Sequence, residues 1–163
     1  MSRQYSPNEL REEIINFLKE HKDGSLATCM NNMPRSSPVQ YFLGDDMNIY
    51  ILSAGGEKFN AISQNPNVCL LVNTEYINYR KIKGVQVFGK ATTSLENSRL
   101  FDEASKYTQE PWLFNSEKGR LNVIKIVPEE IVYLNSLEDG ERTKQILKGN
   151  QVLVKEDRIP ALV

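Results

Sequence analysis

Residues 47–72, MNIYILSAGGEKFNAISQNPNVCLLV, contain the features that decide the fold. The stretch opens with residues 47–52, in which side chains alternate between two sides with the period of a half-buried β-strand. The strand ends at residues 53–56, SAGG, where two glycines allow backbone conformations with positive φ. We therefore expect a strand that runs into a glycine turn.

A short helix and a second strand follow this turn. Residues 57–64 have helical spacing and end at Asn65-Pro66, and residues 68–72 form an apolar run. The helix N-terminus leaves backbone N–H groups unpaired beside Lys58, an arrangement that can hold a phosphate. Most strand-to-helix turns with glycine bind nothing, and Glu57 would repel an anion although it gains from the helix dipole. Both interpretations stay open on this stretch alone.

The composition is typical of an ordinary globular protein. The 163 residues suffice for one domain with a sizeable core, and 40% of them are hydrophobic against 25% charged. A net charge of −1 argues against general binding to nucleic acids or membrane surfaces. The first residues lack the apolar segment of a signal peptide, and no stretch is long and apolar enough to span a bilayer. We therefore expect a cytoplasmic protein.

The cysteines and the histidine do not form a recognisable reactive site. Cys29 and Cys69 each fall inside a predicted strand with no second cysteine close in sequence, so we expect both to be small buried hydrophobic residues. His21 is the single histidine and lies at the expected end of the first helix. A hydrolytic triad would need this residue, so we expect neither a triad nor a metal site and assign no catalytic residue.

Short strands with inserted helices account for most of the chain. Ser6, Pro7 and Glu9 carry the signature of a capped helix start. A longer helix is expected at residues 95–108, ended by Pro111. The expected strands are residues 25–30, 34–43, 47–52, 68–73, 84–93, 121–127 and 131–135.

The strand pattern weakens towards the C-terminus. Residues 136–145 are polar and expected as a loop, and residues 151–155 are expected as a short strand added to a sheet edge or to a partner subunit. Six or seven short strands favour a closed or partly closed antiparallel barrel, because closure removes exposed edges. The predicted fold class is mainly β with flanking helices (α+β). We expect residues 1–136 to form the domain, and residues 137–163 to be an extension of it or to pack on a partner subunit.

A second group of residues supports the phosphate interpretation of the glycine turn. Arg35, Ser37 and Gln40 lie on the strand that precedes residues 47–52, and a hairpin joins the two strands. The start of one strand and the end of the other are then neighbours, so we expect Arg35 and Lys58 to converge on one anion. Each charged hydrogen bond to such an anion contributes roughly 1.5–3 kcal/mol.

Two segments together resemble a known family. The run PRSSPVQYFLGDDMNIYILSAGGEKFNAISQNPNVCLLV, followed by GVQVFGKA, resembles the pyridoxamine 5′-phosphate oxidase-like proteins, which are FMN-binding split β-barrels. The shared pattern is an SPV segment, a strand that ends in serine, a lysine that opens a helix and an NP-x-V exit. The resemblance covers residues 25–93 well and the later helix and strands more loosely. It implies a six- to seven-stranded antiparallel split β-barrel.

The resemblance implies a role for the glycine turn. Lys58 and Ser53, with the backbone around Gly55 and Gly56, would bind the phosphate of FMN, and Arg35 would help.

The strand before the turn would lie along the flavin ring. The resemblance implies that the edge of the isoalloxazine ring runs along Ser37, Pro38, Val39 and Gln40. Backbone groups of this segment and the side chain of Gln40 would form hydrogen bonds with the ring. Leu52 would face the same pocket.

The resemblance also implies a partner. Proteins of this family are usually homodimers with flavin at the subunit interface, so Gly84, Val85 and Trp112 are expected to reach the partner's cofactor. For Trp112 the alternative is simple packing, since large aromatic side chains bury well without a ligand.

Two departures from the family pattern matter. Glu57 stands where many relatives carry a basic residue, which removes one cation from the phosphate site. The strand GRLNVIKIVPEEIVYLN has no histidine, whereas true pyridoxine phosphate oxidases carry an arginine and a histidine for the pyridoxal ring. We therefore do not expect oxidation of vitamin B6.

The expected function is that of an FMN-binding flavoprotein. It is expected to be an oxidoreductase of this type that acts on an unidentified small substrate, with a reduced nicotinamide or another small molecule as electron donor. One alternative is a dimer that binds flavin, heme or deazaflavin for sensing without turnover. A second alternative is a barrel that has lost its cofactor and serves in protein association. Heme is disfavoured because only His21 supplies an imidazole.

Overall fold

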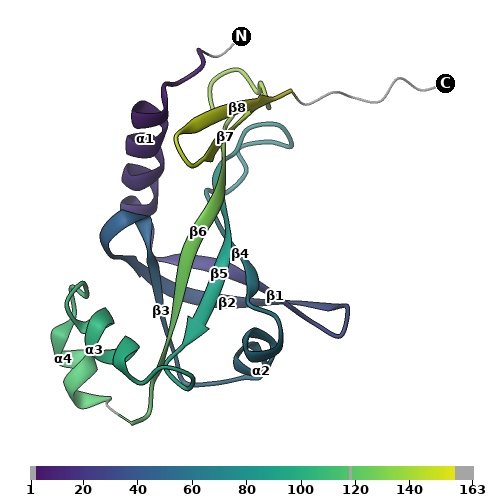
Figure 1. Cartoon of the computed structure of the whole chain (residues 1–163). Coiled ribbons are helices and arrows are strands. Elements are labelled where there is room, and N and C mark those ends of the chain that lie inside the picture. The colour runs from purple at the N-terminus through teal and green to yellow at the C-terminus, as the bar shows by residue number, and fades with distance from the viewer. Residues whose placement is uncertain (1–2, 118, 157–163) are drawn as a thin grey trace.

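Eight strands form one antiparallel sheet within residues 3–117 and 119–156, the part of the chain that the computed structural model describes (Figure 1). The strands are β1 (Asp23–Met30), β2 (Met33–Leu43), β3 (Ile49–Ser53), β4 (Asn67–Asn73), β5 (Lys83–Thr93), β6 (Asn122–Asn135), β7 (Lys144–Lys148) and β8 (Gln151–Lys155). The helices are α1 (Pro7–Glu20), α2 (Glu57–Gln64), α3 (Arg99–Ser105), α4 (Pro111–Ser116) and the 3₁₀ helix η1 (Asp45–Met47). Residues 157–163 of the expected C-terminal extension lie outside the described residues.

The sheet closes on itself through β6. Its strand order is β3-β2-β1-β4-β5-β6-β7-β8, and β3 also pairs with β6. The 14 residues of β6 pair with β3 near their start and with β7 near their end. Strands β1 to β6 therefore form a ring, and β7 and β8 continue the sheet away from it. This is the predicted split β-barrel, but with eight strands in the described sheet instead of six or seven.

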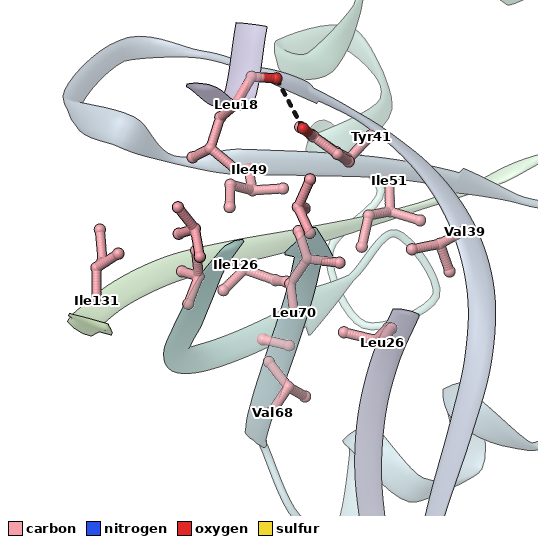
Figure 2. Packing of buried hydrophobic residues seen from close by; sticks show 14 of the residues in the cluster. Leu18, Leu26, Val39, Tyr41, Ile49, Ile51, Val68, Leu70, Ile126 and Ile131 are labelled. Carbon is pink, nitrogen blue, oxygen red and sulfur yellow. Dashed lines mark hydrogen bonds between the residues drawn. The ribbon is translucent and has the colours of Figure 1, made fainter. Parts of the chain in front are cut away.

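Helix α1 covers one opening of the barrel. Its predicted start is confirmed, since the Ser6 hydroxyl accepts from the Glu9 N–H at 3.2 Å and the Glu9 carboxylate accepts from the Ser6 N–H at 2.9 Å. The apolar face of the helix is buried and consists of Leu10, Ile14, Phe17 and Leu18. The Tyr41 hydroxyl donates to the Leu18 carbonyl at 2.7 Å, which fixes the last turn of α1 to β2 (Figure 2).

Two hydrophobic clusters lie on opposite faces of β3. Ile49 and Ile51 point into the barrel and pack in the main cluster shown in Figure 2. Tyr50 points outward and packs in a second cluster beneath α3 and α4 with Leu100, Phe114 and others. Because both faces of β3 are covered, Ile49, Tyr50 and Ile51 are all buried, so the prediction of a half-buried strand was wrong.

The region between β5 and β6 differs from the prediction. The helix expected at residues 95–108 is shorter, since α3 spans Arg99–Ser105. Pro111 does not end that helix but begins α4 as its first residue, where the missing N–H of proline costs nothing.

The last part of the sheet also differs. The two strands expected at residues 121–127 and 131–135 are the single strand β6 (Asn122–Asn135), which continues through a bulge where Pro128 pairs with Gly89. A Cβ on Gly89 would lie 2.3 Å from the Val127 carbonyl oxygen, so only glycine fits this approach. The polar run of residues 136–145 is not all loop, since its end begins β7. The strand expected at residues 151–155 is confirmed as β8.

The two cysteines lie on neighbouring strands, β1 and β4. Cys29 and Cys69 are free and only partly buried, so the prediction that they are buried hydrophobic residues was wrong. Cys69 alternates with the buried Val68 and Leu70 of β4, and Cys29 follows the buried Thr28 of β1, so both face away from the main cluster. No described helix combines the length and apolarity that a membrane span requires.

Candidate functional site

The junction between β3 and α2 brings two side-chain donors to one oxygen atom. The Ser53 hydroxyl lies 3.2 Å from the Gly55 carbonyl oxygen, and the Lys58 ammonium donates to the same oxygen at 2.7 Å. The Gly55 N–H in turn donates to the Ser53 hydroxyl oxygen at 3.4 Å. The cation and the hydroxyl of this turn therefore already point to a common acceptor.

Two glycines give the turn its shape. Gly55 has φ 147° and Gly56 has φ 112° and ψ 175°, a backbone conformation that is essentially restricted to glycine. A Cβ at Gly55 would meet no atom within 4 Å, so the surface outside this residue is open. The sequence prediction of a positive-φ glycine turn is confirmed, and the backbone is accessible to a ligand at this point.

The N-terminus of α2 has no side-chain cap. Gly56 is the N-cap residue, and no side chain accepts a hydrogen bond from the first N–H groups of the helix. Such groups carry a partial positive charge that favours an anion. Glu57 is exposed in this first turn and is the feature that opposes anion binding.

Strand β2 leads the other predicted residues towards the turn. Gln40 pairs with Leu52 of β3, whereas Ser37 pairs with Leu26 and Arg35 with Thr28 on the β1–β2 hairpin. Arg35 thus lies beyond the last pair of the β2–β3 ladder, on the part of the β1–β2 hairpin that extends past the end of β3. Its side chain is exposed, and its convergence with Lys58 stays a prediction.

The residues predicted to line the flavin ring do not all face the same way. Pro38 and Gln40 are exposed on the outside of β2, and Val39 between them is buried in the barrel. Leu52 is partly buried against the second cluster on the outer face of β3, which is the face that Gln40 shares through their pairing. Gln40 and Leu52 are thus neighbours on one outer surface, and Val39 can contribute there only through its backbone.

Two of the residues predicted to reach a partner, Gly84 and Val85, pair with the end of β6 that is remote from the turn, and the third is exposed. Gly84 pairs with Asn73 at the start of β5, and the side chain of Val85 is fully buried in the main cluster. Trp112 in the first turn of α4 is 63% exposed, so the alternative that it is simply packed is not what the structure shows.

Two polar residues that the sequence analysis did not single out lie at the rim beside the turn. Asn122, the first residue of β6, pairs with Ser53, and Ser94 after β5 bonds to it. Their polar character beside the apolar run of β6 is the one signal in the sequence, but it does not place them at the turn, because their position depends on how β3 pairs with β6.

A second cluster of polar side chains lies around Tyr50 of β3, and its members form hydrogen bonds with one another. The Glu103 carboxylate accepts from the Tyr50 hydroxyl at 2.6 Å and from the Lys125 ammonium at 2.5 Å. Hydrogen bonds from Lys125 and Tyr50 hold the pKa of Glu103 below its usual value. Burial is the main cause that raises the pKa of Tyr50, and the hydrogen bond to Glu103 is the second. This group ties α3 to β3 and β6 and has a structural role.

Comparison with known proteins identifies the family. The family model described as pyridoxamine 5′-phosphate oxidase matches residues 10–135. General stress protein 26 of Bacillus subtilis is 29% identical over 136 residues, which cover 83% of this chain and 93% of that protein.

Solved structures share the fold. The FAD-binding protein from Mesorhizobium loti is 21% identical with a TM-score of 0.57, over 74% of this chain and 89% of that one. The heme binding protein from Mycobacterium smegmatis is 12% identical with a TM-score of 0.60, over 96% of this chain and 60% of that one. At these identities the likeness shows the fold alone, whereas the family match spans most of the chain. The chain belongs to the pyridoxamine 5′-phosphate oxidase-like family.

Proposed function

We propose that this protein binds FMN and acts as a flavin-dependent oxidoreductase on a small substrate. The observation that carries the proposal is the convergence of Ser53 and Lys58 on one oxygen atom at the uncapped start of α2. A phosphate oxygen in place of the Gly55 carbonyl would receive the same two donors and the free N–H groups of the helix. The donor set therefore fits a phosphate monoester.

The chain's residues divide into two roles. Lys58, Ser53 and the backbone of the glycine turn would hold the phosphate, with Arg35 as a further cation. Gln40 and Pro38 on the outer face of β2 would orient the ring, with backbone groups of Ser37 and Val39. When bound, FMN would supply hydride transfer, and the protein would supply position and shelter from water.

A flavin fits the described residues better than heme. His21 is the single histidine of the chain, and its Nδ1 lies 2.9 Å from the Phe17 carbonyl oxygen while its ring packs 4.3 Å from the Phe17 ring. The imidazole is therefore tied into the C-terminus of α1, at a distance in sequence and structure from the β3–α2 turn. The phosphate-binding donor set gives heme no comparable support.

A homodimer is part of the proposal. Gly84 pairs with Leu134 near the end of β6, whereas the glycine turn lies beside the start of β6, and the indole of Trp112 is exposed. In a dimer that places flavin at the subunit interface, these residues would reach the partner's cofactor. A small-molecule electron donor or acceptor would complete the reaction.

The test begins with the absorption spectrum of the purified protein and the identity of any released cofactor. Titration of FMN into flavin-free protein, followed by the quenching of flavin fluorescence, then gives the dissociation constant. Lys58→Ala removes one charged hydrogen bond, so we expect binding about 10- to 100-fold weaker. Lys148→Ala, at an exposed end of β7, is the matched control and should bind like the wild type. Full FMN affinity in Lys58→Ala would contradict the proposed phosphate site.

Turnover separates the enzyme from a flavin sensor. The flavin-loaded protein should oxidise a reduced nicotinamide in the presence of a small electron acceptor. A yellow protein that shows no turnover with any small donor would instead support a role in flavin binding or sensing.

A further inference from the structure

The rim of the barrel carries a polar side chain that no role yet explains. Asn122 is the residue of β6 that pairs with Ser53, and directly paired residues on antiparallel strands project to the same face. Their Cβ atoms are then about 4.5–5.5 Å apart. Figure 1 shows β6 beginning at the end of the barrel where β3 leaves for α2. The Asn122 amide thus lies beside the Ser53 hydroxyl of the proposed phosphate site.

A chain of hydrogen bonds fixes which end of this amide is occupied. The Val123 N–H donates to the Ser94 hydroxyl oxygen at 2.9 Å, so the proton of that hydroxyl is free to donate elsewhere. It donates to Asn122 Oδ1 at 3.2 Å. The Ser94 N–H also donates to the Val123 carbonyl at 2.8 Å, which holds the serine against the start of β6. Because the oxygen of the amide is engaged, its Nδ2 group is the end that remains for a ligand.

We infer that Asn122 is a further phosphate-binding residue, oriented by Ser94. The Nδ2 group would donate to the phosphate from the side of β6, while Ser53 and Lys58 donate from the sides of β3 and α2. A neutral donor at this place is chemically useful, because the exposed Glu57 leaves the site with fewer positive charges. The inference rests on the proposed function, since it assumes a phosphate-bearing ligand at the β3–α2 turn.

Asn122→Asp distinguishes a ligand contact from a structural one. The aspartate keeps the acceptor for the Ser94 hydroxyl, so the bond that holds β6 in place persists. It replaces the Nδ2 donors with an anionic oxygen that repels a phosphate. We expect FMN to bind about 100-fold more weakly, with the thermal midpoint of the flavin-free protein little changed. Asn122→Ala, which removes the donors without adding charge, should bind about tenfold more weakly.

The matched control is Asn97→Asp. Asn97 lies in the same connection after β5, is exposed, and also uses its Oδ1 as an acceptor, from the Arg99 N–H at 3.1 Å. Its substitution adds the same charge and keeps the same kind of bond but should leave FMN affinity unchanged.

Ser94→Ala tests the orienting role. It should weaken FMN binding several-fold, and Asn122→Ala should cost less affinity in the Ser94→Ala background than in the wild type, because the two residues act as a unit. Additive effects of the two substitutions would overturn this role of Ser94.

The outcomes separate the two proposals. If Lys58→Ala weakens FMN binding and Asn122→Asp binds like the wild type, the role of Asn122 is wrong while the proposed function stands. If the wild-type protein binds no FMN in the titration, both are wrong. Loss of affinity in Asn122→Asp, with Asn97→Asp unaffected, supports the inference.

Discussion

The N-termini of α1 and α2 begin in opposite ways. At α1, Ser6 and Glu9 form a complete capping box, so side chains of the helix itself occupy the first donors. At α2, Gly56 caps the helix without a side chain, and Lys58 adds a cation beside the free N–H groups. A helix start that satisfies its own donors stabilises the fold, whereas one that leaves them free is suited to an outside acceptor. The difference separates a helix start that is closed by its own side chains from one that can accept the proposed phosphate.

Gly56→Ala, at the open start of α2, should have the largest effect, because it lowers both stability and FMN affinity. Alanine at φ 112° and ψ 175° costs about 1–3 kcal/mol of unfolding free energy, because a Cβ disfavours this conformation. Relief of the strain would move the turn, so FMN affinity should fall as well. Denaturant unfolding and fluorescence titration measure the two effects. Gly149→Ala, in the β7–β8 turn at φ 59°, should lower stability less and leave FMN affinity unchanged. A wild-type unfolding midpoint in Gly56→Ala would show that the turn is not strained.

Ser6→Ala should break only the structural helix start. Loss of the cap costs about 1 kcal/mol of unfolding free energy, and FMN affinity should not change. Ser63→Ala, at an exposed position inside α2, is the control and should shift the unfolding midpoint little. A clear change in FMN affinity for Ser6→Ala would show that the two helix starts are not independent.

Glu57→Gln should have a smaller effect, in which stability falls while FMN affinity rises. Removal of the carboxylate forfeits its interaction with the helix dipole, about 0.3–1 kcal/mol of stability. The same change removes a repulsion from the phosphate, so FMN should bind a few-fold more tightly. Glu12→Gln on α1 should not alter the FMN dissociation constant. Weaker binding in Glu57→Gln would mean that the carboxylate assists the ligand.

The smallest expected effect is the pH dependence that the start of α1 gives to the free energy of unfolding. The ion pair with Arg3, and then the Ser6 N–H, lower the pKa of Glu9 below its ordinary value of 4.5. The ionised carboxylate therefore contributes stability that is present above pH 4.5 and is lost as the pH falls through the lower folded pKa. Unfolding at pH 7 and pH 3 should show a difference between wild type and Glu9→Gln at pH 7 that disappears at pH 3. An equal difference at both pH values would contradict this origin.

Local signals made much of the fold predictable. The capping residues of α1, the glycine turn before α2 and the presence of a strand before that turn depend on neighbours in the sequence, and all three were confirmed. The half-buried character predicted for β3 was wrong, because the second cluster beneath α3 and α4 covers its outer face. Pro111 was misread because proline both ends helices and begins them, and the context that decides lies in the packing of Phe114. The start of β7 was missed because its polar residues are held by pairing with β6.

The candidate site was predictable only where it is local. Ser53, Gly55, Gly56 and Lys58 lie within a few residues of one another, so one stretch of sequence reveals them. Asn122 reaches the site through the register between β3 and β6, which no local pattern specifies.

The pairing of β3 with β6 also has a kinetic consequence. Ile51 and Ile124 are partners although helix α2, strands β4 and β5 and helices α3 and α4 lie between them in the chain, so this contact closes the largest loop of the barrel. Contacts between distant segments are entropically costly and slow the folding of a chain. Ser53 and Asn122 meet only when this contact forms. A ligand held by both strands would bind the closed ring and not the open one, so it would slow the opening of the barrel and shield these strands from hydrogen exchange.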